Sequence, residues 1–99
     1  MSGYRLSKAA ADDLARIAEY TVETFGPAQA LAYRDSLIST FEFLAENPRA
    51  ARLRNELTPP VRMHPHKPHL IIYSVEDDAI LIVRIRHGRE DWISEASDE

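Results

Sequence analysis

The fold of this chain is decided by one stretch near its C-terminal end, Ile80-Leu-Ile-Val-Arg-Ile-Arg-His-Gly-Arg-Glu-Asp-Trp92. Residues 80–85 are rich in branched apolar side chains and predict a buried β-strand. Because side chains alternate across a strand, one face is expected to seal a hydrophobic core and the other to carry positive charge outward. The first face would hold Leu81, Val83 and Ile85, and the second would hold Ile82, Arg84 and Arg86.

The second half of this stretch leaves the apolar pattern and gathers cations around a glycine. Guanidinium groups bind carboxylates and phosphates through paired hydrogen bonds and stay charged at any physiological pH. Side chains of this kind on late strands predict a partner-binding surface, although solvated surface charges are the plainer alternative. The residues predicted to bind a partner or target are Arg62, His64, Arg84, Arg86, His87, Arg89 and Trp92.

The bulk composition indicates one ordinary folded domain. The chain has 99 residues, of which 44% are apolar and 28% charged. No apolar run reaches the roughly 20 residues of a membrane helix, the N-terminus lacks the apolar core of a secretion signal, and no cysteine is available for disulfides. We therefore expect a cytoplasmic protein without membrane contact, with one domain over residues 1–94 and a disordered acidic tail over residues 95–99.

Charge is distributed unevenly along the chain, although the formal net charge is only −4. Residues 1–47 carry a net charge of −3, residues 48–89 carry +4 and all four histidines, and residues 90–99 carry −5. A basic segment inside an acidic protein predicts a localised anionic partner and not direct, sequence-specific binding of nucleic acid.

Two helices are predicted in the first half of the chain. Ser7 is typical of a helix N-cap, and Gly26 followed by Pro27 is typical of a tight joint between two helices. The second helix should end at Asn47-Pro48, because proline disfavours helical backbone in the residue before it. The inward stripes are predicted to be Leu14, Ile17, Ala18, Thr21 and Phe25 on the first helix, and Leu31, Arg34, Leu37, Ile38, Phe41, Leu44 and Ala45 on the second.

Three strands are predicted after the helices. They cover Val61–His66, His69–Val75 and Ala79–Arg86, and a short acidic turn joins the last two into an antiparallel hairpin. A further short strand is predicted at residues 4–6, and residues 49–60 are expected to form an irregular connector. The predicted class is α+β, in the order β-α-α-β-β-β, with a helical hairpin packed on one face of a small antiparallel sheet.

Several short motifs, in this order, resemble the RelE/ParE superfamily of toxin–antitoxin toxins, and most closely its ParE branch. They fall within residues 4–92 and are Tyr4-Arg-Leu-Ser7, Gly26-Pro27-Ala-Gln-Ala30, Val61-Arg62-Met63-His64-Pro65-His66, Leu70-Ile-Ile-Tyr73 and Arg84-Ile-Arg-His87-Gly88-Arg89-Glu-Asp-Trp92. The sequence departs from the common ParE pattern at Arg86, where an aliphatic residue is more usual, and at Glu90, where a second arginine is. The first change adds a positive charge and the second removes one.

The resemblance implies a small cytoplasmic toxin that an antitoxin wraps and neutralises. ParE-like members block DNA gyrase by binding, so the resemblance implies gyrase as the target, a ParD-like antitoxin as the partner in a hetero-oligomer, and no cofactor. An acidic stretch of the antitoxin would then complement Arg62, Arg84 and Arg86.

Two other activities stay open at the level of sequence. RelE-like relatives cut messenger RNA on the ribosome, and in such a ribonuclease Arg62 and Arg84 would stabilise the phosphate while His87 served as acid or base. An acidic tail and the presence of only two lysines count against close contact with RNA. The third interpretation is a family member that binds its partner but is not toxic.

Two smaller features have more than one interpretation. His64, His66 and His69 are imidazoles of the kind that bind transition metals, but prolines interrupt the segment and no cysteine is present, so we expect no metal site. Trp92 follows the last predicted strand and would either fold back on the core or anchor a partner peptide.

Overall fold

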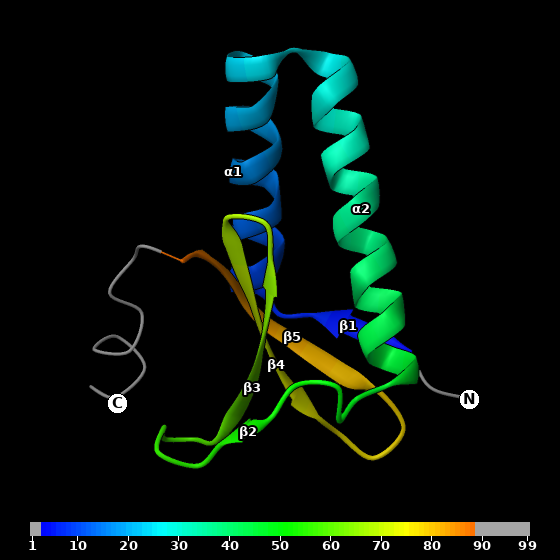
Figure 1. Cartoon of the computed structure of the whole chain (residues 1–99), viewed down its shortest axis with the longest axis vertical. Helices are drawn as coiled ribbons and strands as arrows, with labels where there is room; N and C mark the ends of the chain where they lie inside the picture. Colours follow the sequence, from blue (N-terminus) through cyan, green and yellow to red (C-terminus); the bar gives the residue numbers. More distant parts are fainter. Residues whose placement is uncertain (1–2, 89–99) are drawn as a thin grey trace.

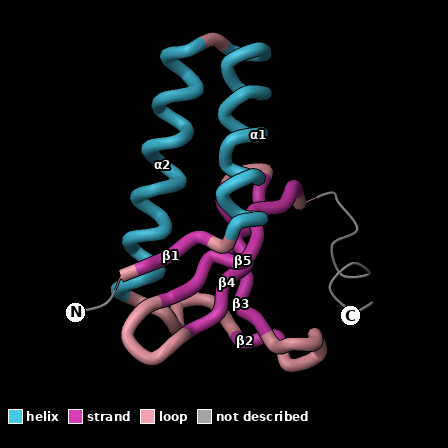
Figure 2. The backbone as a smooth tube through the Cα atoms, turned by 180° about the vertical axis from the view of Figure 1, so that it is seen from behind, coloured by secondary structure: helices cyan, strands magenta, loops and turns pink. Residues whose placement is uncertain are grey.

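The computed structural model describes residues 3–88, and its helices and strands follow the predicted order (Figure 1). The elements are β1 (Tyr4–Leu6), α1 (Lys8–Phe25), α2 (Pro27–Glu46), β2 (Leu53–Arg54), β3 (Val61–His66), β4 (His69–Val75) and β5 (Ile80–His87). The α+β class is confirmed. The two helices form an antiparallel hairpin whose tip extends well beyond the sheet (Figures 1 and 2). Within the described residues, no helix is both long and apolar enough to cross a membrane.

The sheet is mixed, which differs from the antiparallel sheet that was predicted. Its strand order is β1-β5-β4-β3-β2, and every neighbouring pair is antiparallel except β1 with β5. β4 covers one edge of β5, so β1 pairs with the other edge and must end where α1 begins. Ser7 fixes that end, because its N–H donates to the Ile82 carbonyl at 3.0 Å and its Oγ to the Val83 carbonyl at 2.7 Å. β2 adds a short fifth strand within the connector that was expected to be irregular.

The predicted helix boundaries are confirmed by their caps. Ser7 Oγ accepts a hydrogen bond from the N–H of Ala10 at 2.9 Å, as an N-cap residue does. Gly26 has a φ of 95°, in the region where a side chain would be strained, and Pro27 occupies the first position of α2. The joint between the helices therefore takes the form that the sequence predicted.

The main core lies between the helical hairpin and one face of the sheet. Its fully buried large side chains are Leu37, Phe41, Leu44, Ile71, Tyr73, Ile80 and Ile82. Three residues of the predicted inward stripes are exposed instead, with Phe25 at 65%, Leu31 at 59% and the Arg34 side chain at 51%. Phe25 and Leu31 flank the hairpin tip, where none of the described strands lies beneath the helices (Figure 2).

A β-bulge in β5 changes which of its residues face the core. Ile72 of β4 pairs with Arg84, but Tyr73 pairs with Ile82, so Val83 is an extra residue. The bulge puts Ile85 in the core cluster together with Ile82, whereas Val83 packs with Ile72 in a smaller cluster. The predicted core position of Ile85 is therefore confirmed, whereas Val83 was wrongly placed on the core face and Ile82 on the outward face.

Candidate functional site

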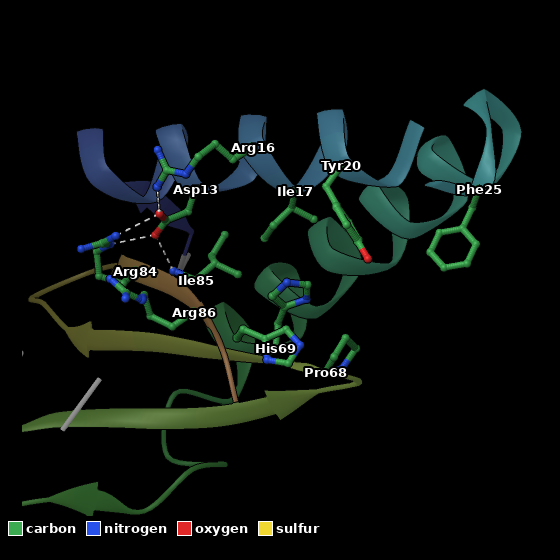
Figure 3. Close-up of a pocket in the computed structure, with 11 residues that line it drawn as sticks. Asp13, Arg16, Ile17, Tyr20, Phe25, Pro68, His69, Arg84, Ile85 and Arg86 are labelled. Carbon is green, nitrogen blue, oxygen red and sulfur yellow. Dashed lines mark hydrogen bonds and ion pairs between the residues drawn. The ribbon is translucent and has the colours of Figure 1, made fainter. Parts of the chain in front are cut away.

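Asp13 of α1 makes the main polar connection between the helices and β5 (Figure 3). Its side chain is only 4% exposed. Oδ2 accepts hydrogen bonds from Arg84 Nε at 2.8 Å and from the backbone N–H of Ile85 at 3.0 Å, and Oδ1 accepts from Arg84 Nη2 at 3.0 Å. Arg16, one helical turn further along α1, donates to Oδ1 as well. The carboxylate therefore binds the Arg84 guanidinium through two parallel hydrogen bonds, the strongest form of this contact.

The position of Asp13 follows from the shortness of β1. The pairing of β1 with β5 stops at Ile82, and further along this edge β5 pairs with no other strand of the described residues. A buried N–H without an acceptor costs about 1–3 kcal/mol, and Asp13 supplies the acceptor for Ile85. Burial alone would raise the pKa of Asp13, but hydrogen bonds from Arg84 and Ile85, with the charges of Arg84 and Arg16, lower that pKa below its ordinary value of 3.8.

A groove of about 640 Å³ lies beside this ion pair, between α1 and the neighbouring ends of β4 and β5 (Figure 3). Its size falls in the range of ligand-binding pockets. One part of the lining is apolar and contains Ile17 with two largely exposed aromatic rings, Tyr20 at 62% and Phe25 at 65%. The rest is mainly polar and cationic and includes Arg16, Pro68, His69, Arg84, Arg86 and His87.

His66 of β3 connects that strand to α2 through contacts with two hydroxyl groups. Its Nε2 lies 3.0 Å from Ser36 Oγ and its Nδ1 lies 3.1 Å from Thr40 Oγ1, while each hydroxyl also donates to a carbonyl of α2, at 2.8 and 2.9 Å. A hydroxyl has one proton, so one of them must turn from its carbonyl to donate to a neutral imidazole. Burial, followed by the charges of Lys67 and His64, lowers the pKa of His66 below its ordinary value of 6.5.

Tyr33 of α2 links this contact to the groove. Its Oη lies 2.7 Å from Nδ1 of His69, and its ring centroid lies 5.5 Å from that of His66. The His69 ring meets the His87 ring edge-on, with centroids 5.7 Å apart. Burial raises the pKa of Tyr33 to about 12, so its hydroxyl stays protonated. Within residues 3–88, these imidazoles assemble into no cluster of three metal-ligating side chains.

Acidification is expected to weaken the contact between β3 and α2. Because the folded-state pKa of His66 is lowered, its contribution to stability is fully present above the unfolded value of about 6.5 and is lost as the pH falls through the folded pKa. The free energy of unfolding of the wild type, measured by urea titration, should therefore decline below about pH 6.5 more steeply than that of His66→Gln. An NMR titration midpoint for the His66 ring at or above its ordinary value would contradict this prediction.

Comparison with known proteins identifies the family. A family model described as the ParE toxin of the parDE type II toxin–antitoxin system matches residues 4–92. The chain belongs to the ParE toxin family. Toxin ParE3 of Caulobacter vibrioides is 32% identical over 77 residues, which cover 78% of this chain and 77% of that relative. A solved structure of a chromosomal ParDE toxin–antitoxin system from P. aeruginosa matches with a TM-score of 0.74 and 26% identity, over 88% of this chain and 95% of that one.

The structure brings together only some of the residues that were predicted to form one surface in this ParE-family toxin. Arg84, Arg86 and His87 all line the groove. The guanidinium of Arg84 does not simply point outward, as its predicted strand face required, because it is bound by buried Asp13. Arg89 lies outside the described residues, as does Trp92.

Arg62 and His64 lie away from the groove. Arg62 Nη1 donates to the carbonyl of Ala51 at 2.6 Å and holds the connector after α2. His64 packs its ring near that of Phe43, with centroids 6.3 Å apart. His66 and His87 occupy the same row of the sheet, through their pairing with His69, and Arg62 lies four residues back along β3, about 13 Å away. Arg62 and His87 therefore do not form one compact site.

Asp13 and Tyr33 support the groove, although neither role was predicted from the sequence. A signal for Asp13 was present, because it lies three residues after Ala10 and four before Ile17 and so shares a helical face with them. An acidic residue within an apolar helical stripe indicates a buried partner. Tyr33 carried no comparable signal, since its contact with His69 joins residues far apart in the sequence.

Proposed function

We propose that this ParE-family toxin acts in the cytoplasm by binding and blocking DNA gyrase, without making or breaking a bond itself. We also propose that a ParD-type antitoxin neutralises it. Membership of the ParE family supports the gyrase target, and the similarity to a ParDE system from P. aeruginosa supports the partner.

The groove between α1 and β5 is the observation that carries the binding mechanism. It places exposed Tyr20 and Phe25 beside the cations Arg16 and Arg86. An amphipathic segment with apolar and acidic side chains complements both parts, since it would cover the rings and pair with the guanidinium groups. We propose that the antitoxin docks a segment of this chemistry there.

The separation of the cationic residues supports binding over RNA cleavage. Cleavage needs a proton acceptor, a phosphate-stabilising cation and a proton donor around one phosphate. Arg62 lies about 13 Å along the sheet from the row that contains His87, and Arg84 is held by Asp13. These three side chains are therefore poorly placed to act on one phosphate.

The direct test is gyrase supercoiling of relaxed plasmid, titrated with the purified chain. Loss of supercoiling, or trapped cleaved DNA, that is reversed by the ParD-type antitoxin is the expected result. Normal gyrase activity together with cut transcripts on translating ribosomes would replace the proposal with a ribonuclease. Normal activity in both assays, with the antitoxin still bound, would indicate a family member that is not toxic.

A further inference from the structure

Asp13 does not depend on Arg16 for its hydrogen bonds. Its carboxylate accepts from Nε and Nη2 of Arg84 at 2.8 and 3.0 Å and from the N–H of Ile85 at 3.0 Å, so both oxygens have a partner without Arg16. Arg16 adds a further bond to Oδ1, the oxygen that already accepts from Arg84 Nη2. Asp13 would therefore remain paired if the Arg16 side chain turned elsewhere.

The Arg16 side chain can leave this contact at little cost. It is 63% exposed, although its partner Asp13 is buried, and it donates to an oxygen that it shares with Arg84. Water solvates an exposed guanidinium when its ion pair opens, so pairs of this kind contribute little to stability. Arg16 also lines the groove, so its side chain can turn into the groove itself.

Arg16 stands next to an exposed aromatic ring on α1. Tyr20 follows it by four residues, and side chains with this spacing lie on one face of a helix, about 6 Å apart. Both residues line the groove, and Phe25 lines it near the end of the same helix (Figure 3). The wall that α1 contributes to the groove therefore presents a guanidinium group beside apolar surface.

We propose that Arg16 selects an acidic residue of the docked antitoxin segment, by leaving Asp13 and binding the carboxylate of that residue. This inference rests on the proposed function of the groove. A partner carboxylate offers two oxygens, so Arg16 can form with it the paired hydrogen bonds that Arg84 already forms with Asp13. Arg84 keeps Asp13 during the exchange, so the connection between α1 and β5 is preserved.

The spacing on α1 also defines the segment that fits. A carboxylate at Arg16 and an apolar side chain over Tyr20 must project from the same side of the segment, about 6 Å apart. Residues two apart in an extended strand and residues four apart in a helix both have roughly this separation. The inferred partner is therefore a segment in which an acidic and an apolar residue are spaced in one of these two ways.

Replacement of Arg16 by glutamine separates binding from stability. Arg16→Gln should weaken the complex with the ParD-type antitoxin about tenfold in isothermal calorimetry, which corresponds to about 1.4 kcal/mol. Its melting temperature should stay within about 4 °C of that of the wild type, because Arg84 still holds Asp13. A larger fall in melting temperature would show that Asp13 needs both arginines and would overturn the exchange.

Arg34→Gln is the matched control for this substitution. The Arg34 side chain is 51% exposed, carries the same charge and does not line the groove, so this variant should bind like the wild type. Arg16→Lys should bind with intermediate affinity, because an ammonium group keeps the charge but cannot form two parallel hydrogen bonds. The affinity of the wild type should also fall more steeply with NaCl concentration than that of Arg16→Gln.

The possible outcomes separate this inference from the function on which it rests. If the wild type binds the antitoxin but Arg16→Gln and Arg34→Gln have equal affinities, the role of Arg16 is overturned and the proposed function stands. An unchanged dependence on NaCl in Arg16→Gln would assign its effect to packing and overturn the pairing with a carboxylate. Absence of binding by the wild type would reject the proposed antitoxin partner, and the inference with it.

Discussion

Replacement of Asp13 by alanine is expected to lower the free energy of unfolding by about 3 kcal/mol. The change removes the acceptor shared by the Arg84 guanidinium and the Ile85 N–H. Loss of one partner of a buried ion pair typically costs about 3–5 kcal/mol, and the Arg84 side chain is 32% exposed, so water replaces part of the lost interaction. For a domain of this size, the melting temperature should fall by roughly 12–24 °C.

Asp12→Ala is the matched control for this substitution. Asp12 precedes Asp13 on α1, but its side chain is 54% exposed and meets Lys8 at 3.4 Å. Exposed pairs of this kind contribute little, so the control should change stability by less than about 0.5 kcal/mol. Urea denaturation followed by circular dichroism measures both variants. Equal stabilities for the two would show that the connection between Asp13 and Arg84 is not a main support of the fold.

The pH dependence of stability provides a second readout of the same ion pair. Because the folded-state pKa of Asp13 is lowered, its contribution is present above the unfolded value of about 3.8 and is lost as the pH falls through the folded pKa. The wild type loses this contribution on acidification and Asp13→Ala does not, so their unfolding free energies should approach each other below about pH 4. A constant difference across that range would contradict an ionised Asp13 in the folded state.

The sequence predicted those parts of the fold that depend on local signals. Ser7 and Gly26-Pro27 mark helix ends through hydrogen bonds and backbone angles within a few residues, and the structure follows them. The direction of β1 depends on its pairing with residues more than 70 positions away, and the bulge at Val83 depends on how β4 pairs with β5. A one-residue bulge reverses the faces of the residues beyond it, so a strict alternation could not place both Ile82 and Ile85 in the core, where the structure has them.

The candidate site shows the same division between local and long-range information. The run of arginines and histidines after position 83 correctly predicted cations at the end of the last strand, and the groove forms there. The role of Arg84 could not be predicted from that run, because it depends on a carboxylate 71 residues earlier in the chain. Phe25, in the apolar part of the groove, was assigned to the core, since the sequence does not show that the hairpin extends past the sheet.

Arg86→Glu is expected to weaken binding of the ParD-type antitoxin about 30-fold or more, which corresponds to about 2 kcal/mol. Arg86 lines the groove, and the reversed charge would oppose an acidic side chain of the docked segment. Isothermal calorimetry measures the effect. Arg49→Glu is the matched control, because Arg49 is exposed outside the groove and its reversal changes the net charge equally. The control should bind like the wild type.

Charge reversal at Arg84, which lines the groove together with Arg86, would not test the same contact. Arg84→Glu places a carboxylate against buried Asp13, so it should destabilise the chain, and any loss of affinity would combine unfolding with lost binding. The informative result is therefore a selective one, in which Arg86→Glu keeps a melting temperature near that of Arg49→Glu but loses affinity. Equal affinities of Arg86→Glu and Arg49→Glu would show that the antitoxin does not rely on this groove, and its docking site would then have to lie elsewhere, for example near Arg62 and His64.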